Sequence, residues 1–253
     1  MTQDTPKTII ALVTGANKGI GRAVATSLAK DHGYSVIIGS RQAAAGEALA
    51  DELQLKGYQA SSVQLDLSSD ESIANAVKSI EQKYGRLDVL VNNAGVLLDW
   101  CHPLKPKFPT RELWNTTFTT NVIGPACLTE ALVPLLRKAK DGRPRLVFVS
   151  SSMSSLANAT NKDMPYYNLE ATAYDSSKAA VNMLALQYVR ILEDVGGIVN
   201  IACPGLVSTD LTLMNPAATT PEEGAEHIVK FATDVEGKVN GTFSNKMFGT
   251  IPW

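Results

Sequence analysis

The chain has 253 residues, of which 45% are hydrophobic and 19% charged, and this composition can bury a large core. Its formal net charge of -2 offers no general attraction to nucleic acid or anionic membranes. No apolar run approaches the ~20 residues that a membrane span requires. Three widely spaced cysteines, Cys101, Cys127 and Cys203, indicate neither a disulfide framework nor a metal site. We therefore expect one cytoplasmic domain over residues 1–253, with no nucleic acid, membrane or metal partner.

Short β-branched runs alternate with longer amphipathic stretches along the chain. The predicted strands cover residues 8–14, 35–39, 61–65, 87–91, 145–150 and 197–202. The predicted helices cover residues 22–31 (extended backward through a glycine loop), 43–56, 70–84, 111–138 and 172–194. Strands that are apolar on both faces and separated by helices form parallel sheets through right-handed crossovers. The pattern predicts a doubly wound, Rossmann-type α/β fold with a parallel sheet of six or seven strands flanked by helices.

The segment that follows the first predicted strand is rich in glycine and opens the first helix. It reads Thr14-Gly-Ala-Asn-Lys-Gly-Ile-Gly21. Glycine lets the backbone approach a pyrophosphate closely, and a helix N-terminus presents unpaired N–H groups to it. Any tight strand-to-helix turn can use glycine, so the position after the first strand is what favours a dinucleotide site. The candidate cofactor contacts in this loop are Gly15, Asn17, Lys18, Gly19, Ile20 and Gly21.

The second predicted strand ends in Ile38-Gly39-Ser40-Arg41. Folds that prefer NAD usually place an acidic residue here to bind the ribose hydroxyls. This strand end carries no carboxylate, and Arg41 and Lys18 supply two cations that suit a ribose 2'-phosphate. The sequence therefore predicts NADP(H) rather than NAD(H). The alternative is that both cations are ordinary solvated side chains.

Tyr174 and Lys178 lie four residues apart in a predicted helix, so both side chains project from one helix face. An ammonium beside a phenol favours the phenolate and draws the phenol pKa down from ~10. The spacing predicts that Lys178 lowers the pKa of Tyr174 toward the range useful for proton transfer. Most Tyr-x-x-x-Lys matches are surface pairs. This one follows the fifth predicted strand and a serine cluster, residues 150–152, and that location favours catalysis.

Two irregular stretches, residues 158–170 and 206–220, come after strand ends, where ligands bind in this architecture. An apolar pocket wall there would suit aryl or alkyl ketones, aldehydes or diketones. The alternative is that these side chains are ordinary packing residues. The candidate pocket residues are Leu97, Trp100, Tyr166, Tyr167, Leu213 and Met214.

These motifs stand in the order found in the short-chain dehydrogenase/reductase family, which the chain resembles over nearly its whole length. Further signatures that carry the resemblance are Asp66-Leu67, Asn92-Asn-Ala-Gly95, Asn121, Ser151 and Pro204-Gly205. Within the family the chain is most similar to the carbonyl reductases. They share the Asn-Lys-Gly-Ile-Gly loop, the arginine after the second strand and a related Cys-Pro-Gly segment.

The resemblance implies a catalytic tetrad. Ser151 would hydrogen-bond the substrate carbonyl, with Ser152 as the fallback, and Tyr174 would protonate the developing alkoxide. Lys178 would bind the cofactor ribose, and Asn121 would hold a water that relays protons. The cofactor contacts implied outside the glycine loop are Asp66 and Leu67 at the adenine, Asn93, Ala94 and Gly95 on the ribose side, Tyr174, Lys178, Pro204 and Gly205, and Val207 and Thr209 at the carboxamide.

The expected activity is hydride transfer from NADPH to a small-molecule ketone or aldehyde. Alternatives are an alcohol or steroid dehydrogenase that runs in the oxidative direction, a catalytically silent NADP-binding regulator, and a pure interaction module. The intact tetrad argues against the regulator, and the glycine loop argues against the interaction module. An insertion before Tyr174, shorter than that of carbonyl reductases, leaves open whether the protein is a monomer or a homo-oligomer.

Overall fold

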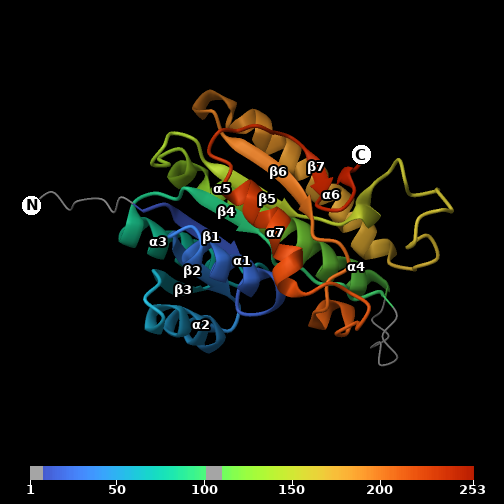
Figure 1. Ribbon diagram of the computed structural model, residues 1–253, viewed down its shortest axis with the longest axis horizontal. Coiled ribbons are helices and arrows are strands. Elements are labelled where there is room, and N and C mark those ends of the chain that lie inside the picture. The colour runs from blue at the N-terminus through green and yellow to red at the C-terminus, as the bar shows by residue number, and fades with distance from the viewer. Residues whose placement is uncertain (1–7, 101–109) are drawn as a thin grey trace, which may run out of the picture.

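The computed structural model describes residues 8–100 and 110–253, so Cys101 lies outside the described residues. Its centre is an eight-stranded sheet with helices on both faces (Figure 1). The strand order is β3-β2-β1-β4-β5-β6-β7-β8, and only β8 runs antiparallel to its neighbour among the described strands. The prediction of a doubly wound Rossmann-type sheet is confirmed. The seven parallel strands match the predicted number, and the short β8 is additional.

The elements follow the predicted alternation as far as the sixth strand, and the helix and two strands that come after it lie outside the predicted ranges. The strands are β1 (Ile10–Thr14), β2 (Ser35–Ser40), β3 (Ala60–Gln64), β4 (Val89–Asn92), β5 (Arg145–Val149), β6 (Ile198–Cys203), β7 (Phe243–Asn245) and β8 (Gly249–Thr250). The α-helices are α1 (Gly19–Lys30), α2 (Ala43–Leu55), α3 (Asp70–Tyr84), α4 (Thr110–Phe118), α5 (Gly124–Leu136), α6 (Thr172–Ile191) and α7 (Pro221–Ala232). Single turns of 3-10 helix occupy η2 (Ser152–Ser154), η3 (Glu193–Val195) and η4 (Asp210–Thr212).

Two buried apolar layers hold the helices to the sheet. Leu12 of β1 packs in the layer that contains α3, α5 and α6, and its neighbour Val13 packs in the layer of α1, α2 and α7. This alternation follows from the two-residue period of a strand. The chain leaves β1 and β4 in opposite directions, and that switch point is where such sheets bind ligands. No helix of the described residues combines the length and apolarity needed to cross a membrane.

The predicted long helix over residues 111–138 is wrong in one respect, because a π-helical turn, η1 (Thr119–Ile123), divides it into α4 and α5. Gly124 follows this turn and packs directly on another segment. A Cβ at Gly124 would lie 2.3 Å from the carbonyl oxygen of Leu67. Single π-helical turns inside helices occur often at functional sites. This one contains Asn121.

Asp88, a buried carboxylate, closes the amino end of the sheet just before β4. Its oxygens accept the N–H of Ile10 at 2.7 Å and the N–H of Lys140 at 2.6 Å. The guanidinium of Arg86 lies 3.3 Å from the same carboxylate. Asp88 thereby joins β1, β4 and the segment that follows α5.

We expect Asp88→Ala to lower the free energy of unfolding by about 3 kcal/mol or more, because the buried N–H of Ile10 loses its acceptor and the buried Arg86 loses its ion-pair partner. Urea unfolding followed by circular dichroism measures the change. The exposed Asp163→Ala serves as the control and should stay within about 0.5 kcal/mol of the parent. Equal stability of the two variants would contradict the structural role of Asp88.

Candidate functional site

The glycine loop is folded so tightly that three of its positions require glycine. Gly15 and Gly19 have φ angles of +62° and +54°, in the left-handed region. Gly21 has no room for a side chain, since a Cβ would lie 2.4 Å from the Gly15 carbonyl oxygen and 2.5 Å from Nδ2 of Asn93. The loop therefore brings the start of α1 against the end of β4.

The start of α1 offers donors suited to a pyrophosphate. Within the described residues, the N-cap Lys18 makes no side-chain capping bond, and the first turn contains no acidic residue. The first N–H groups of a helix lack partners inside it and carry a partial positive charge. These groups are the donors that the predicted pyrophosphate contact would use.

The segment after β4 is fixed beside this loop by Thr14. The Thr14 hydroxyl accepts the N–H of Asn93 at 3.0 Å and the N–H of Ala94 at 2.9 Å. In return the Asn93 amide donates to the Thr14 carbonyl oxygen at 2.9 Å. The predicted ribose-side residues Asn93 and Ala94 therefore border the glycine loop.

Three further predicted residues meet at Gly95. A Cβ there would lie 3.2 Å from Oδ1 of Asn121 and 3.4 Å from Nζ of Lys178. Asn121 is fully buried, and its amide bonds both backbone groups of Val96, at 2.8 and 2.9 Å. The same amide donates to the Ser177 hydroxyl at 3.0 Å. Asn121 thus ties the segment after β4 to α6, and this contact adds a structural role to the predicted water relay.

The remaining tetrad residues also converge, on the buried side of α6. Lys178 Nζ lies 5.7 Å from the centre of the Tyr174 ring and donates to the Val149 carbonyl oxygen at 2.9 Å. The Ser151 side chain lies close enough to the Tyr174 hydroxyl to lower the pKa of this phenol by hydrogen bonding. Ser151 follows β5 and also accepts the N–H of Met153 at 3.2 Å. The side chains of the predicted tetrad, which come from η1, the segment after β5 and α6, therefore lie close together.

Burial is the main cause of the pKa shifts of Tyr174 and Lys178. It raises the pKa of Tyr174 well above the ordinary range, with smaller contributions from Cys203 and Asp175, while the hydrogen bond with Ser151 acts in the opposite direction. Burial also lowers the pKa of Lys178 to about 8. The predicted lowering of the Tyr174 pKa by Lys178 is therefore wrong in this structure, because loss of hydration on burial outweighs hydrogen bonding with Ser151, which lowers the pKa. Tyr174 remains protonated at neutral pH.

The two predicted cations near the ribose have different surroundings. Arg41 is exposed directly after β2, and its charge contributes to a lowered pKa of Asp66, whose main cause is hydrogen bonding from Ser68. Lys18 Nζ forms an ion pair with Asp210 at 2.5 Å, and both side chains are about two-thirds exposed. Sequence reasoning missed Asp210, which stands in the loop after β6 and far from Lys18 in sequence.

The loop after β6 also borders the glycine loop. A Cβ at Gly19 would lie 3.3 Å from Cγ2 of Thr209. Val207 is buried and forms an isolated parallel bridge with Thr219. Pro204 and Gly205 lead from β6 into this loop, and Gly205 has a φ of +81°. The predicted carboxamide residues Val207 and Thr209 thus lie at the same end of the sheet as the tetrad.

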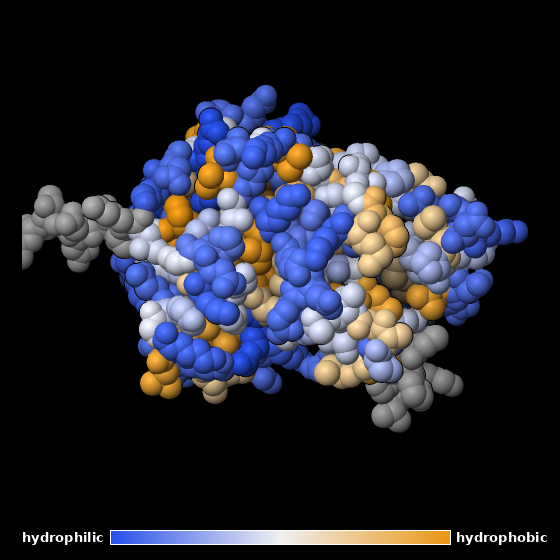
Figure 2. Space-filling model, in the orientation of Figure 1, coloured by the Kyte–Doolittle hydropathy of each residue, from blue (hydrophilic) through white to orange (hydrophobic). Residues whose placement is uncertain are grey.

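The predicted substrate residues differ in their contacts and in their burial. Tyr166 donates from its hydroxyl to the Ser152 carbonyl oxygen at 3.0 Å, so it borders the serine cluster. Leu97 and Trp100 are half-buried beyond β4, and Tyr167 is 41% exposed. Apolar residues gather toward the end of the molecule that carries α4 (Figure 2). The large apolar side chains that the loop after β6 exposes are Leu206, Leu211, Leu213 and Met214.

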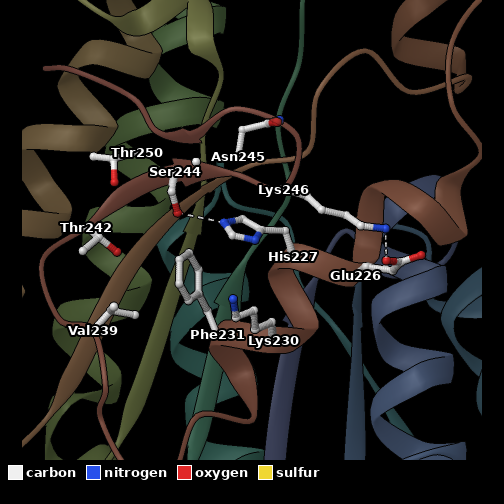
Figure 3. Close-up of a pocket in the computed structure, with 11 residues that line it drawn as sticks. Glu226, His227, Lys230, Phe231, Val239, Thr242, Ser244, Asn245, Lys246 and Thr250 are labelled. Carbon is white, nitrogen blue, oxygen red and sulfur yellow. Dashed lines mark hydrogen bonds and ion pairs between the residues drawn. The ribbon is translucent and has the colours of Figure 1, made fainter.

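A cavity of about 450 Å³ lies between α7 and the β7–β8 edge, and its lining contains none of these site residues (Figure 3). There His227 Nε2 lies 2.8 Å from the Ser244 hydroxyl, and Lys246 pairs with Glu226. A second cavity, of about 400 Å³, is lined by Asp66 and residues of α3. Only the second adjoins a predicted cofactor residue.

A family model described as short chain dehydrogenase matches residues 9–219. The chain belongs to the short-chain dehydrogenase/reductase family. It is 37% identical to the short-chain dehydrogenase/reductase eupG of Phoma sp over 218 residues, covering 80% of this chain and 78% of that protein. It is 30% identical to carbonyl reductase (NADPH) 1 of Bos taurus, covering 94% of this chain and 96% of that protein.

Solved structures agree with this assignment. Salutaridine reductase from Papaver somniferum superimposes with a TM-score of 0.80 at 26% identity, covering 93% of this chain and 99% of that one. A 3-ketoacyl-ACP reductase from Sinorhizobium meliloti gives 0.77 at 29% identity, covering 93% of this chain and 96% of that one. The protein is therefore an oxidoreductase of the family that binds nicotinamide cofactors.

We expect Gly21→Ala to weaken binding of the nicotinamide cofactor by about tenfold or more, because the added Cβ forces Gly15 and Asn93 out of place. Titration of nicotinamide fluorescence measures the dissociation constant. Gly249→Ala is the control, since this first residue of β8 has open space around an added Cβ and lies away from the loop. Unchanged binding in Gly21→Ala would contradict the assignment of this loop.

Proposed function

We propose that the protein is an NADPH-dependent carbonyl reductase that transfers hydride to a small-molecule ketone or aldehyde. The observation that carries this proposal is the meeting of Tyr174, Ser151 and Lys178 beside the segment that borders the glycine loop. One proton donor, one hydrogen-bond donor and one ammonium at the carboxyl edge of the sheet form a constellation suited to carbonyl reduction.

Each residue has a separate task in this proposal. NADPH, when bound, supplies the hydride. Tyr174 gives its phenolic proton to the carbonyl oxygen as negative charge develops there, and the Ser151 hydroxyl donates a hydrogen bond to the same oxygen. Lys178 binds the cofactor ribose and keeps positive charge near the phenol. Asn121 holds α6 against the segment after β4 and orients the water that returns protons from solvent.

The protonation state of Tyr174 is compatible with its proposed role as the proton donor. Burial raises the pKa of this phenol, so it holds its proton at neutral pH. A general acid in carbonyl reduction needs that protonated form.

Two observations support NADPH over NADH. Arg41 stands exposed directly after β2, where NAD-preferring relatives of this fold carry an acid. The bovine relative is named as an NADPH carbonyl reductase. The ion pair between Lys18 and Asp210 means that Arg41 is the principal candidate for the 2'-phosphate.

The test of this function is consumption of NADPH by the purified protein with a panel of ketones, aldehydes and diketones, with NADH in parallel. We expect turnover that is at least about tenfold more efficient with NADPH, since one charge-assisted pair contributes roughly that factor. Equal efficiency with both cofactors would contradict the role of Arg41. Tight NADPH binding without any turnover would favour the silent regulator.

We expect Tyr174→Phe to lower kcat by about a hundredfold or more, since general acid catalysis contributes roughly 10²–10⁴-fold. The dissociation constant for NADPH should remain close to that of the parent. Stopped-flow measurement of hydride transfer and fluorescence titration report the two quantities. Tyr58→Phe, on the far side of the sheet beside α2, controls for loss of a phenol. Near-normal turnover in Tyr174→Phe would remove the tyrosine from the mechanism.

A further inference from the structure

The helix that carries Tyr174 begins without a cap of its own. Its N-cap residue is Ala171, whose side chain offers no acceptor. Tyr174 is the third residue of α6, so its backbone N–H is one of those that lack a partner inside the helix. The position of this first turn sets the position of the phenol. Some group outside α6 has to hold it.

Asp99 supplies that acceptor from the segment after β4. Its Oδ2 accepts the N–H of Ala173 at 2.6 Å and the N–H of Tyr174 at 3.3 Å. These are the second and third amides of the helix, the same two that an ordinary N-cap side chain binds. Asp99 is only 6% exposed, so water does not compete for the bond. The carboxylate therefore caps α6 from another element.

The negative charge of Asp99 also acts on the groups around it. It faces the positive, N-terminal end of the α6 dipole, and this attraction stabilises the start of the helix. It contributes to the raised pKa of Tyr174, behind the larger effects of burial, Cys203 and Asp175. Burial and Asp99 together raise the pKa of Asp175 to about 7. Oδ1 of Asp99 and Oδ1 of Asp175 are both buried without a hydrogen-bond partner within the described part of the chain.

We propose that Asp99 is a positioning residue for catalysis, which holds the first turn of α6 so that the Tyr174 hydroxyl meets the substrate carbonyl. This inference rests on the proposed carbonyl reduction and deepens it. Asp99 acts through the helix backbone and does not touch the reacting atoms. It connects the segment that lines the cofactor to the residue that donates the proton. Its loss should therefore affect turnover more than cofactor binding.

Two substitutions at Asp99 separate the effect of losing its hydrogen-bond acceptor from the effect of losing its negative charge. Asp99→Asn keeps an oxygen that can accept one amide, but a neutral acceptor is weaker, so we expect kcat to fall about threefold to tenfold. Asp99→Leu keeps the size and removes the acceptor, and we expect a loss on the order of a hundredfold because the phenol moves out of place. The dissociation constant for NADPH should change by less than about twofold in both. A higher kcat in Asp99→Asn than in Asp99→Leu would show that Asp99 positions the helix through its acceptor oxygen and does not only fill space.

Asp88→Asn is the matched control. Asp88 is also buried and also accepts two backbone N–H groups, but at the opposite end of β4. We expect it to lower stability while kcat per folded molecule stays within about twofold of the parent. A fall of kcat in Asp88→Asn as large as in Asp99→Asn would overturn the proposal, because general loosening of the fold would then explain both.

Amide hydrogen exchange tests the contact without reference to turnover. In the parent protein the peptide over residues 171–178 should show protected amides at Ala173 and Tyr174, and Asp99→Leu should lose that protection while α1 keeps its own. If the parent reduces no carbonyl, the exchange result still reports on the cap, so failure of the proposed function and failure of this inference are distinguishable.

The proposal is overturned if Asp99→Leu retains kcat within about twofold of the parent, if Asn and Leu cause equal losses, or if NADPH binding falls in parallel with kcat. If Asp99→Leu does not fold, Asp99→Asn decides alone. An unchanged kcat in that variant sinks the proposal. A reduced kcat with unchanged NADPH binding and faster exchange at the start of α6 supports it.

Discussion

The site depends on the backbone segment that follows β4, residues 93–99. Side chains from other elements fix the beginning and the middle of this segment, and the segment itself fixes the start of α6. The Thr14 hydroxyl binds its first amides, and the Asn121 amide binds it midway. At its far end Asp99 binds the start of α6. This segment therefore sets the distance between the glycine loop and Tyr174. A shift in it would move both halves of the site relative to each other.

Burial governs the charges within that frame. Tyr174 is 8% exposed and Lys178 is 5% exposed, and removal from water disfavours the charged form of each. The phenol therefore holds its proton more firmly and the ammonium holds its proton less firmly. The four-residue spacing of Tyr174 and Lys178 reports only the attraction between the ammonium and the phenolate. The hydration that both groups lose is a property of the packed fold, and no pair of residues in the sequence reports it.

The features that the sequence predicts well are those with a local signal. The buried strands read as β-branched runs, the glycine loop reads as a cluster after β1, and the i,i+4 spacing alone places Tyr174 and Lys178 on one face. Helix α7 carries a local signal as well, a capping box between Thr220 and Glu223 with Pro221 at the first position, but it is not among the predicted helices. The tetrad residues meet in the structure, and their catalytic roles stay predictions.

The features that the sequence does not predict are contacts between distant segments. Lys18 and Asp210 are 192 positions apart, and Asp99 and Ala173 are 74 apart. The π-helical turn at Asn121 accompanies a close approach of Gly124 to another segment, which hydrophobic periodicity cannot report. In each case the residue type gives no sign of its partner. Such contacts become visible only when the sheet topology brings the segments together.

Two buried aspartates at opposite ends of β4 show how one chemistry serves two purposes. Asp88 stands before the strand and Asp99 beyond it, and each accepts two backbone amides from other segments. Ligands of such sheets bind at the carboxyl ends of the strands, so we assign the bonds of Asp88, at the amino end, to stability. At the carboxyl end the same kind of bonds hold the helix that carries Tyr174, the proposed proton donor. The direction of the strands thereby places Asp99, and not Asp88, beside the proposed site.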